Sequence, residues 1–173
     1  PDQKIDCVAY GCTSGTIAAG FDVIEKNVKL AKPQAKVTTP ITSAIKALKA
    51  FNVSKISVFT PYTKSINDSV INYFNKENIT VNGLTYFDIE SDLDIGKVDE
   101  EYLFEVLSKI DLEDSEALFV SCTALPVLSI IDKLEKKMNK VILSSNQTLI
   151  WESLKAIGYK NNIEGFGKLF KFN

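Results

Sequence analysis

The sequence contains neither histidine nor arginine, so all 20 of its basic residues are lysines. Without histidine, a Ser–His or Cys–His catalytic pair is excluded, as are most catalytic zinc sites. Without arginine, no guanidinium group can hold a carboxylate through two parallel hydrogen bonds. Proton transfer must therefore use cysteine, tyrosine, lysine or carboxylates, and an anionic substrate needs backbone N–H groups and hydroxyls as its donors.

Other signatures of common protein classes are also missing. The three cysteines include no Cys-x-x-Cys pair, which argues against a disulfide framework and against a structural zinc site. A net charge of −2 indicates no nucleic-acid or anionic membrane partner. There is no apolar run of about 18 residues, no signal peptide, no Gly-x-Gly-x-x-Gly and no Walker motif. We therefore expect a cytoplasmic protein that binds no metal, nucleotide, nucleic acid or membrane.

Strand and helix patterns alternate along the chain with short connections, which is typical of a parallel α/β architecture. The strands are expected at 5–11, 55–60, 80–87, 116–121 and 140–144. The helices are expected at 14–29, 40–51, 64–77, 99–110, 124–137 and 147–157. The helix at 40–51 has the clearest signals, because Thr39 can cap it, Pro40 suits its first turn, and its apolar residues recur on one face.

Cys12 and Cys122 occur in similar local sequences. Each ends an apolar run and is followed by a threonine and small residues that lead into a helical pattern. The carboxyl ends of parallel strands are where open α/β sheets bind ligands, and a helix N-terminus favours the reactive thiolate form of cysteine. The repeated Cys-Thr step therefore predicts two thiols that face one ligand. Hydroxyl donors to an anion would come from Thr13, Ser14, Thr16 and Thr123.

Free cysteine is also a common core residue, so a structural role must be weighed for each thiol. Cys7 lies inside the strand expected at 5–11 and is predicted to pack in the core. We expect it to resist alkylation more than Cys12 and Cys122. Taken alone, the threonines and serine named above would be helix caps, and Tyr62 a half-buried strand-end residue.

Five motifs in a fixed order carry a family resemblance. They are Ala9-Tyr-Gly-Cys-Thr-Ser-Gly15, Val37-Thr-Thr-Pro40, Val58-Phe-Thr-Pro-Tyr-Thr63, Val120-Ser-Cys-Thr123 and Ser145-Asn-Gln-Thr-Leu-Ile-Trp151. Over roughly residues 5–158 the chain resembles the aspartate/glutamate racemase superfamily, most closely its maleate cis–trans isomerase and arylmalonate decarboxylase branch. The resemblance implies two pseudo-symmetric α/β lobes, each with a parallel sheet flanked by helices. A small carboxylate would bind between the lobes, without a metal or organic cofactor.

The resemblance also implies the lobe boundaries. Residues 39–146 would form the second lobe, and residues 1–38 with 147–173 the first. The chain enters a buried-type strand almost at its first residue, although buried parallel strands need layers on both faces. We therefore interpret the first lobe as incomplete at its N-terminus, lacking an upstream segment that supplies ligand-binding residues in the family.

Carried over residue by residue, the resemblance makes Cys12 and Cys122 the catalytic thiols of the two lobes. Its substrate-binding residues would be Thr13, Ser14, Tyr62 and Thr123. Asp92 falls near a position where the isomerases tend to carry a ligand-binding asparagine. A carboxylate there would repel a dicarboxylate unless protonated or turned away, so Asp92 is left out of the predicted site.

Two departures from the family pattern rank the expected activities. Ala124 stands where the amino-acid racemases commonly have histidine, and Cys12 is a cysteine that the decarboxylases typically lack. The leading hypothesis is cofactor-independent cis–trans isomerisation of maleate or a related small dicarboxylate. The alternatives are racemisation or arylmalonate-type decarboxylation, and a non-catalytic carboxylate-binding or degenerate fragment. The sequence leaves formation of a homo-oligomer open.

Overall fold

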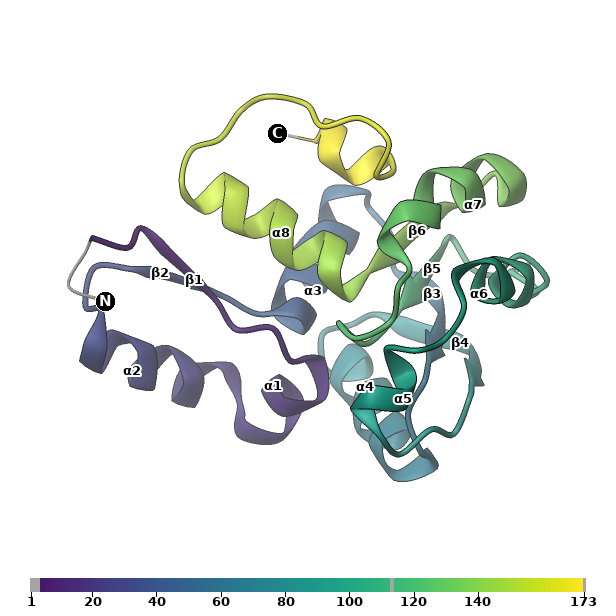
Figure 1. Cartoon of the computed structure of the whole chain (residues 1–173), viewed down its shortest axis with the longest axis horizontal. Helices are drawn as coiled ribbons and strands as arrows, with labels where there is room; N and C mark the ends of the chain where they lie inside the picture. Colours follow the sequence, from purple (N-terminus) through teal and green to yellow (C-terminus); the bar gives the residue numbers. More distant parts are fainter. Residues whose placement is uncertain (1–3, 113, 173) are drawn as a thin grey trace.

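The computed structural model describes residues 4–112 and 114–172. It contains two parallel sheets flanked by helices (Figure 1). The larger sheet has the strand order β4-β3-β5-β6, with β3 at Lys55–Thr60, β4 at Thr80–Tyr86, β5 at Ala117–Val120 and β6 at Val141–Ser144. The smaller sheet pairs β1 (Cys7–Ala9) with β2 (Lys36–Thr38). The predicted α/β class with parallel sheets is confirmed, while the predicted lobe boundaries stay a prediction.

The central strands of the larger sheet hold the core because both of their faces are covered. All four residues of β5 are buried, and so are the last five of β3, as expected for parallel strands packed between helices. The register pairs Phe59 with Val120 and Val120 with Ser144. The carboxyl ends of these three strands are therefore level, and the segments that follow them begin at one edge of the sheet.

Helices connect the strands and cover both sheets. They are α1 (Thr13–Ala19), α2 (Phe21–Ala31), α3 (Pro40–Ala50), α4 (Lys64–Lys76), α5 (Asp92–Ile95), α6 (Glu100–Leu107), α7 (Ile131–Met138) and α8 (Ser145–Ala156), with 3-10 helices at Leu128–Ile130 and Lys168–Lys171. No helix in the described part of the chain is long and apolar enough to cross a membrane.

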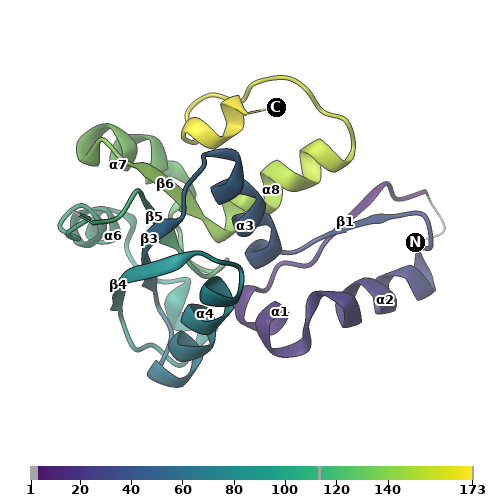
Figure 2. The same cartoon turned by 180° about the vertical axis from the view of Figure 1, so that it is seen from behind.

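Helix α8 joins the two sheets. It starts directly after β6, packs along α3 and contacts both β1 and β2. Figures 1 and 2 show the smaller sheet between α8 on one side and the α1–α2 segment on the other. The first turn of α8 is therefore held near the strand ends of the larger sheet while its later turns cover the smaller one.

Several predicted elements differ from the observed ones. The single helix expected at 14–29 is divided into α1 and α2 at Gly20, whose φ of 84° interrupts the helical backbone. The helix expected at 124–137 begins later, with the 3-10 helix and then α7. Pro126 lies in the non-helical stretch before them, and proline disfavours the helical backbone in the residue that precedes it. The short elements β2 and α5 were not expected.

Candidate active site

A cavity of about 270 Å³ lies where α1, α5 and the segments after β3 and β5 meet. It is lined by Cys12, Thr13, Ser14, Tyr62, Cys122 and Thr123, together with Gly11, Asp92 and Ala124. Thr16, which was predicted as a further donor to an anion, does not line it, and its buried hydroxyl donates to the Cys12 carbonyl over 2.6 Å. The lining residues are up to 113 positions apart in the sequence (124 − 11). The fold therefore brings both cysteines to one cavity, as the repeated Cys-Thr step predicted, and both are free thiols.

Cys12 occupies the N-cap position of α1 in an extended conformation, with φ −137°. The backbone N–H of Gly15 donates to its Sγ atom over 3.2 Å, and the Ser14 hydroxyl lies 3.8 Å from the same sulfur. A Cβ atom at position 15 would lie 2.8 Å from that sulfur and 2.9 Å from the Tyr10 hydroxyl, so the arrangement requires glycine. An N–H donor aimed at sulfur stabilises the thiolate form.

Cys122 follows β5 and is almost fully buried, with 5% of its surface exposed. Its φ of 86° lies in a region that favours glycine, so its backbone is strained. Contrary to the sequence prediction, no α-helix begins here. Burial raises the pKa of the thiol, although the Ala124 N–H, 3.4 Å from Sγ, and the Tyr62 hydroxyl oppose this rise. The Asp92 carboxylate raises the pKa further, so Cys122 favours the protonated thiol.

Tyr62 extends from the loop after β3 and is 5% exposed. Burial, and then the neighbouring Cys122 sulfur, raise the pKa of its phenol far above the ordinary value. The side chain therefore remains a neutral hydrogen-bond donor. The buried Asn67 fixes this loop, because its amide donates to the Tyr62 carbonyl over 3.1 Å.

Ser145, the first residue of α8, links the two cysteine loops and was not singled out from the sequence as a site residue. Its fully buried hydroxyl accepts from the Thr13 hydroxyl over 2.9 Å and from the Cys122 N–H over 3.1 Å. The Thr123 hydroxyl donates to the Gly11 carbonyl over 2.8 Å, which adds a second link. The only sequence signal for Ser145 was its place in the fifth motif.

These bonds change what the two threonines can offer to a ligand. A hydroxyl has one proton, and the hydroxyl protons of Thr13 and Thr123 are directed to protein acceptors. The first N–H groups of a helix have no intrahelical acceptor, and Thr13 and Ser14 are the first residues of α1. Donors for an anion at this end of the cavity are therefore the backbone N–H groups and the Ser14 hydroxyl rather than the threonine hydroxyls.

Asp92 is the first residue of α5, and its exposed side chain lines the same cavity. The sequence interpretation left Asp92 out of the site, and its position in the cavity wall corrects that exclusion. Its charge acts on the Cys122 thiol, as described above. Among residues 4–112 and 114–172, no group of three or more His, Cys, Asp or Glu side chains is arranged to hold a metal ion.

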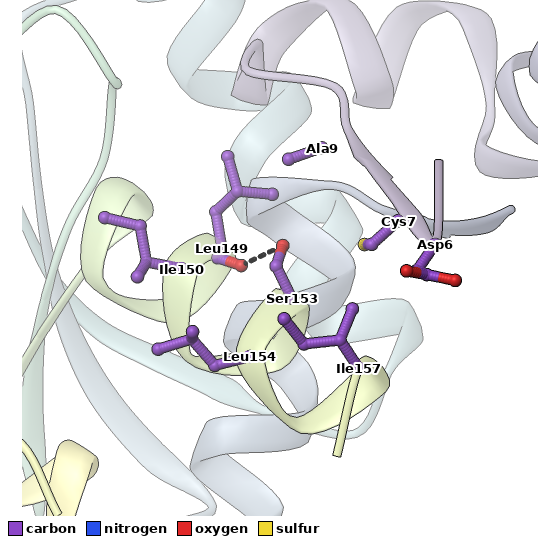
Figure 3. A pocket seen from close by; sticks show the side chains of 8 residues that line it. All are labelled: Asp6, Cys7, Ala9, Leu149, Ile150, Ser153, Leu154 and Ile157. Carbon is purple, nitrogen blue, oxygen red and sulfur yellow. Dashed lines mark hydrogen bonds between the residues drawn. The ribbon is translucent and has the colours of Figure 1, made fainter. Parts of the chain in front are cut away.

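Cys7 differs from its prediction. It is partly exposed rather than packed in the core, and its sulfur lies 4.0 Å from the Thr38 hydroxyl. It lines a separate, mainly apolar cavity of about 420 Å³ between β1 and one face of α8 (Figure 3). Because β1 pairs with β2 and no further strand is described beside it, Cys7 does not gain the cover of an inner strand.

The chain is similar to known proteins in sequence and in fold. The sequence profile of the arylmalonate decarboxylase family matches residues 21–170. The maleate isomerase of Geobacillus stearothermophilus is 26% identical over 176 residues, which cover 97% of this chain and 70% of that protein.

Two solved structures have the same fold. A maleate isomerase variant from Pseudomonas putida S16, solved with maleate, is 21% identical with a TM-score of 0.87, covering 98% of this chain and 71% of that one. A cysteine variant of the Nocardia farcinica maleate cis–trans isomerase, with a covalently bound succinylcysteine intermediate, is 18% identical with a TM-score of 0.88. That match covers 97% of this chain and 72% of the other.

Proposed function

This chain belongs to the arylmalonate decarboxylase family, and we propose that it is a cofactor-independent cis–trans isomerase of a small unsaturated carboxylate. The observation that carries the proposal is the pair of thiols, Cys12 and Cys122, on the wall of one cavity but in different environments. The maleate isomerases among its relatives support the reaction class. A decarboxylase needs one proton donor, whereas addition to an alkene needs both a nucleophile and an acid.

The two thiols divide these roles. Cys12 is the more accessible thiol, it is at the N-cap of α1, and its sulfur accepts the Gly15 N–H, so it takes the role of the nucleophile. It forms a carbon–sulfur bond with one alkene carbon, and the π electron pair moves to the neighbouring carbon. Cys122, which favours the protonated thiol, delivers its proton to that carbon.

The adduct has a single bond where the double bond was, so its two halves can rotate. After the rotation, the Cys122 thiolate removes the proton that now faces it from that same carbon, the double bond re-forms in the trans arrangement, and the Cys12 thiolate leaves. No electron or proton is gained or lost over the cycle, so the chemistry requires no redox partner. The covalent succinylcysteine reported for the Nocardia farcinica relative is the kind of adduct that this sequence of steps forms.

Substrate binding follows from the donors around the cavity. The first N–H groups of α1 and the Ser14 hydroxyl face the Cys12 end, and the neutral Tyr62 phenol lies beside Cys122. Hydrogen bonds from these groups can hold one carboxylate without any cationic side chain. The phenol has one proton, so after Cys122 has delivered its own proton Tyr62 can donate to the Cys122 thiolate only in place of the carboxylate.

Incubation of the protein with maleate, followed by proton NMR, tests the proposal. We expect the fumarate signal to grow and the maleate signal to decrease. A folded protein whose thiols are protected by a small carboxylate, yet which isomerises neither maleate nor the monoamide of maleate, would contradict the isomerase proposal and favour a binding protein.

Decarboxylation is the second candidate, because the matched family is described by that activity and Cys122 is a protonated thiol suited to protonating a carbanion. Release of carbon dioxide from an arylmalonate, retained in a Cys12→Ser variant, would favour this candidate. Isomerisation requires Cys12, so the two activities are separated by the same variant.

A further inference from the structure

The charge on the cavity wall is distributed unevenly. Asp92 is the formally charged residue among those that line the cavity, and no lysine of the described chain is part of the wall. Its carboxylate acts electrostatically on Cys122, whereas the N–H groups that suit an anion are at the start of α1, beside Cys12. The end of the cavity beside Cys12 can therefore bind a carboxylate, whereas the end beside Cys122 already has the Asp92 carboxylate.

A substrate with two carboxylates would fit this arrangement poorly. Its second negative charge would lie near Asp92, and like charges repel each other. A group that donates a hydrogen bond would instead find a strong, charged acceptor there.

We propose that Asp92 selects a substrate with a single carboxylate, whose other end donates a hydrogen bond, as the carboxamide of an unsaturated dicarboxylic monoamide does. This inference rests on the proposed function, because it names the substrate class of the same site. The carboxylate lies at the α1 end, the reacting carbons lie between the two sulfurs, and the amide N–H donates to Asp92.

The competing explanation is that Asp92 serves only the short helix α5. An acidic residue in the first turn complements the helix dipole, and both Asp92 and Asp94 occupy that turn. Asp94 differs in one respect that makes it a matched control, because its carboxylate accepts from Lys97 over 2.8 Å and it does not line the cavity. An effect of α5 stability alone would appear in both Asp92→Asn and Asp94→Asn.

The test measures binding with saturated analogues that cannot be isomerised. The measurement is the concentration of succinate, or of its monoamide succinamate, that halves the rate at which iodoacetamide alkylates Cys12 and Cys122. We expect the wild-type protein to bind succinamate about tenfold more tightly than succinate, the ratio for a difference of about 1.4 kcal/mol. Asp92→Asn should abolish or reverse this preference, while Asp94→Asn should keep it. High salt should reduce it, because Asp92 is exposed and its charge is screened.

Each other result overturns the inference. It is overturned if the two analogues protect the wild-type thiols equally, if succinate protects them better, or if neither analogue protects them. It is also overturned if Asp92→Asn leaves the ratio of the two analogues unchanged. Thermal unfolding confirms that the variants are folded.

Turnover of maleate and of its monoamide by the same variants is followed separately by NMR. A binding preference without turnover of either compound would contradict the proposed isomerase function and leave the role of Asp92 supported. Turnover of maleate with an unchanged ratio in Asp92→Asn would support the isomerase function and contradict the role of Asp92.

Discussion

The loops that contain Cys12 and Cys122 have similar sequences but differ in backbone conformation and in the burial of the thiol. The Cys12 backbone is extended and its sulfur receives an N–H bond at the start of a helix. The Cys122 backbone is strained, its thiol is buried, and the chain after it forms bends rather than an α-helix. A repeated local motif can therefore bring two identical side chains to one cavity while the surrounding fold gives them different burial and different hydrogen-bond donors.

The largest effect is expected from replacing either cysteine with serine. The two variants should lose activity in different ways. Cys12→Ser removes the nucleophile and should abolish both turnover and the covalent adduct. Cys122→Ser removes the acid, so we expect a loss of about 10²–10⁴-fold in turnover, with an adduct still detectable on Cys12 by mass spectrometry. An adduct that requires Cys122 and not Cys12 would reverse the roles assigned here.

Gly15→Ala should disturb Cys12 and leave Cys122 unchanged. The added methyl group would lie 2.8 Å from the Cys12 sulfur, so the sulfur must move. Because misplacement of a reacting group by about 1 Å can cost about 100-fold, we expect a kcat loss of that order. Gly11→Ala adds a methyl group to the same loop with no atom within 4 Å, so its loss should be much smaller. Equal losses would show that Cys12 is not held in place by this contact.

Ser145→Ala should disturb both loops together. It leaves the buried Thr13 hydroxyl and the Cys122 N–H without their acceptor, which we expect to cost about 1–3 kcal/mol of the free energy of unfolding. Turnover should fall as well, because the strained Cys122 backbone loses the bond that holds it. Ser65→Ala, at an exposed position on α4, is the control and should change neither quantity. Unchanged denaturant unfolding of Ser145→Ala would contradict the linking role.

The pH dependence of alkylation should separate the two thiols further. Burial raises the pKa of Cys122, so its thiolate forms at higher pH than that of a short cysteine peptide, whose pKa is about 8.5. Its alkylation should therefore reach half its maximal rate above that pH, and isomerisation should decline as the pH rises through the same range, because the acid loses its proton. Asp92→Asn removes a charge that raises this pKa, so the midpoint should shift to lower pH. A midpoint at or below the peptide value would contradict the assignment of Cys122 as the acid.

The smallest effect is expected at Cys7, which lies outside the cavity that Cys12 and Cys122 line. Because its side chain is partly exposed, Cys7→Ser should cost less than about 1 kcal/mol and leave turnover unchanged. Exposure also means that iodoacetamide should reach Cys7 readily, so alkylation rate by itself does not identify the active-site thiols. Protection does, since a small carboxylate should protect Cys12 and Cys122 and not Cys7. Peptide-resolved mass spectrometry measures all three.

The sequence by itself determined the elements whose signals are local. The β-branched and apolar run at 55–60 was predicted with the observed bounds of β3, because an inner parallel strand is apolar on both faces. The helix starting at Pro40 was predicted by its first residue and its periodicity; Thr39 occupies the predicted N-cap position but makes no side-chain capping bond. The Cys-Thr steps were predicted to lie near strand ends, and each does. Cys12 follows β1 of the smaller sheet and Cys122 follows β5 of the larger one, so their meeting at one cavity also depends on how the two sheets are packed.

Only the tertiary structure decided the environment of each side chain. Asp92 follows an irregular segment that has no periodic pattern, so its position on the cavity wall depends on how that segment crosses the sheet edge. Ser145 meets Thr13 across 132 positions of sequence, a contact that no local pattern encodes. The exposure of Cys7 and the burial of Cys122 likewise depend on which neighbours cover each strand end. Burial and charge are sums over such neighbours, and therefore the pKa of a thiol follows from the fold rather than from its motif.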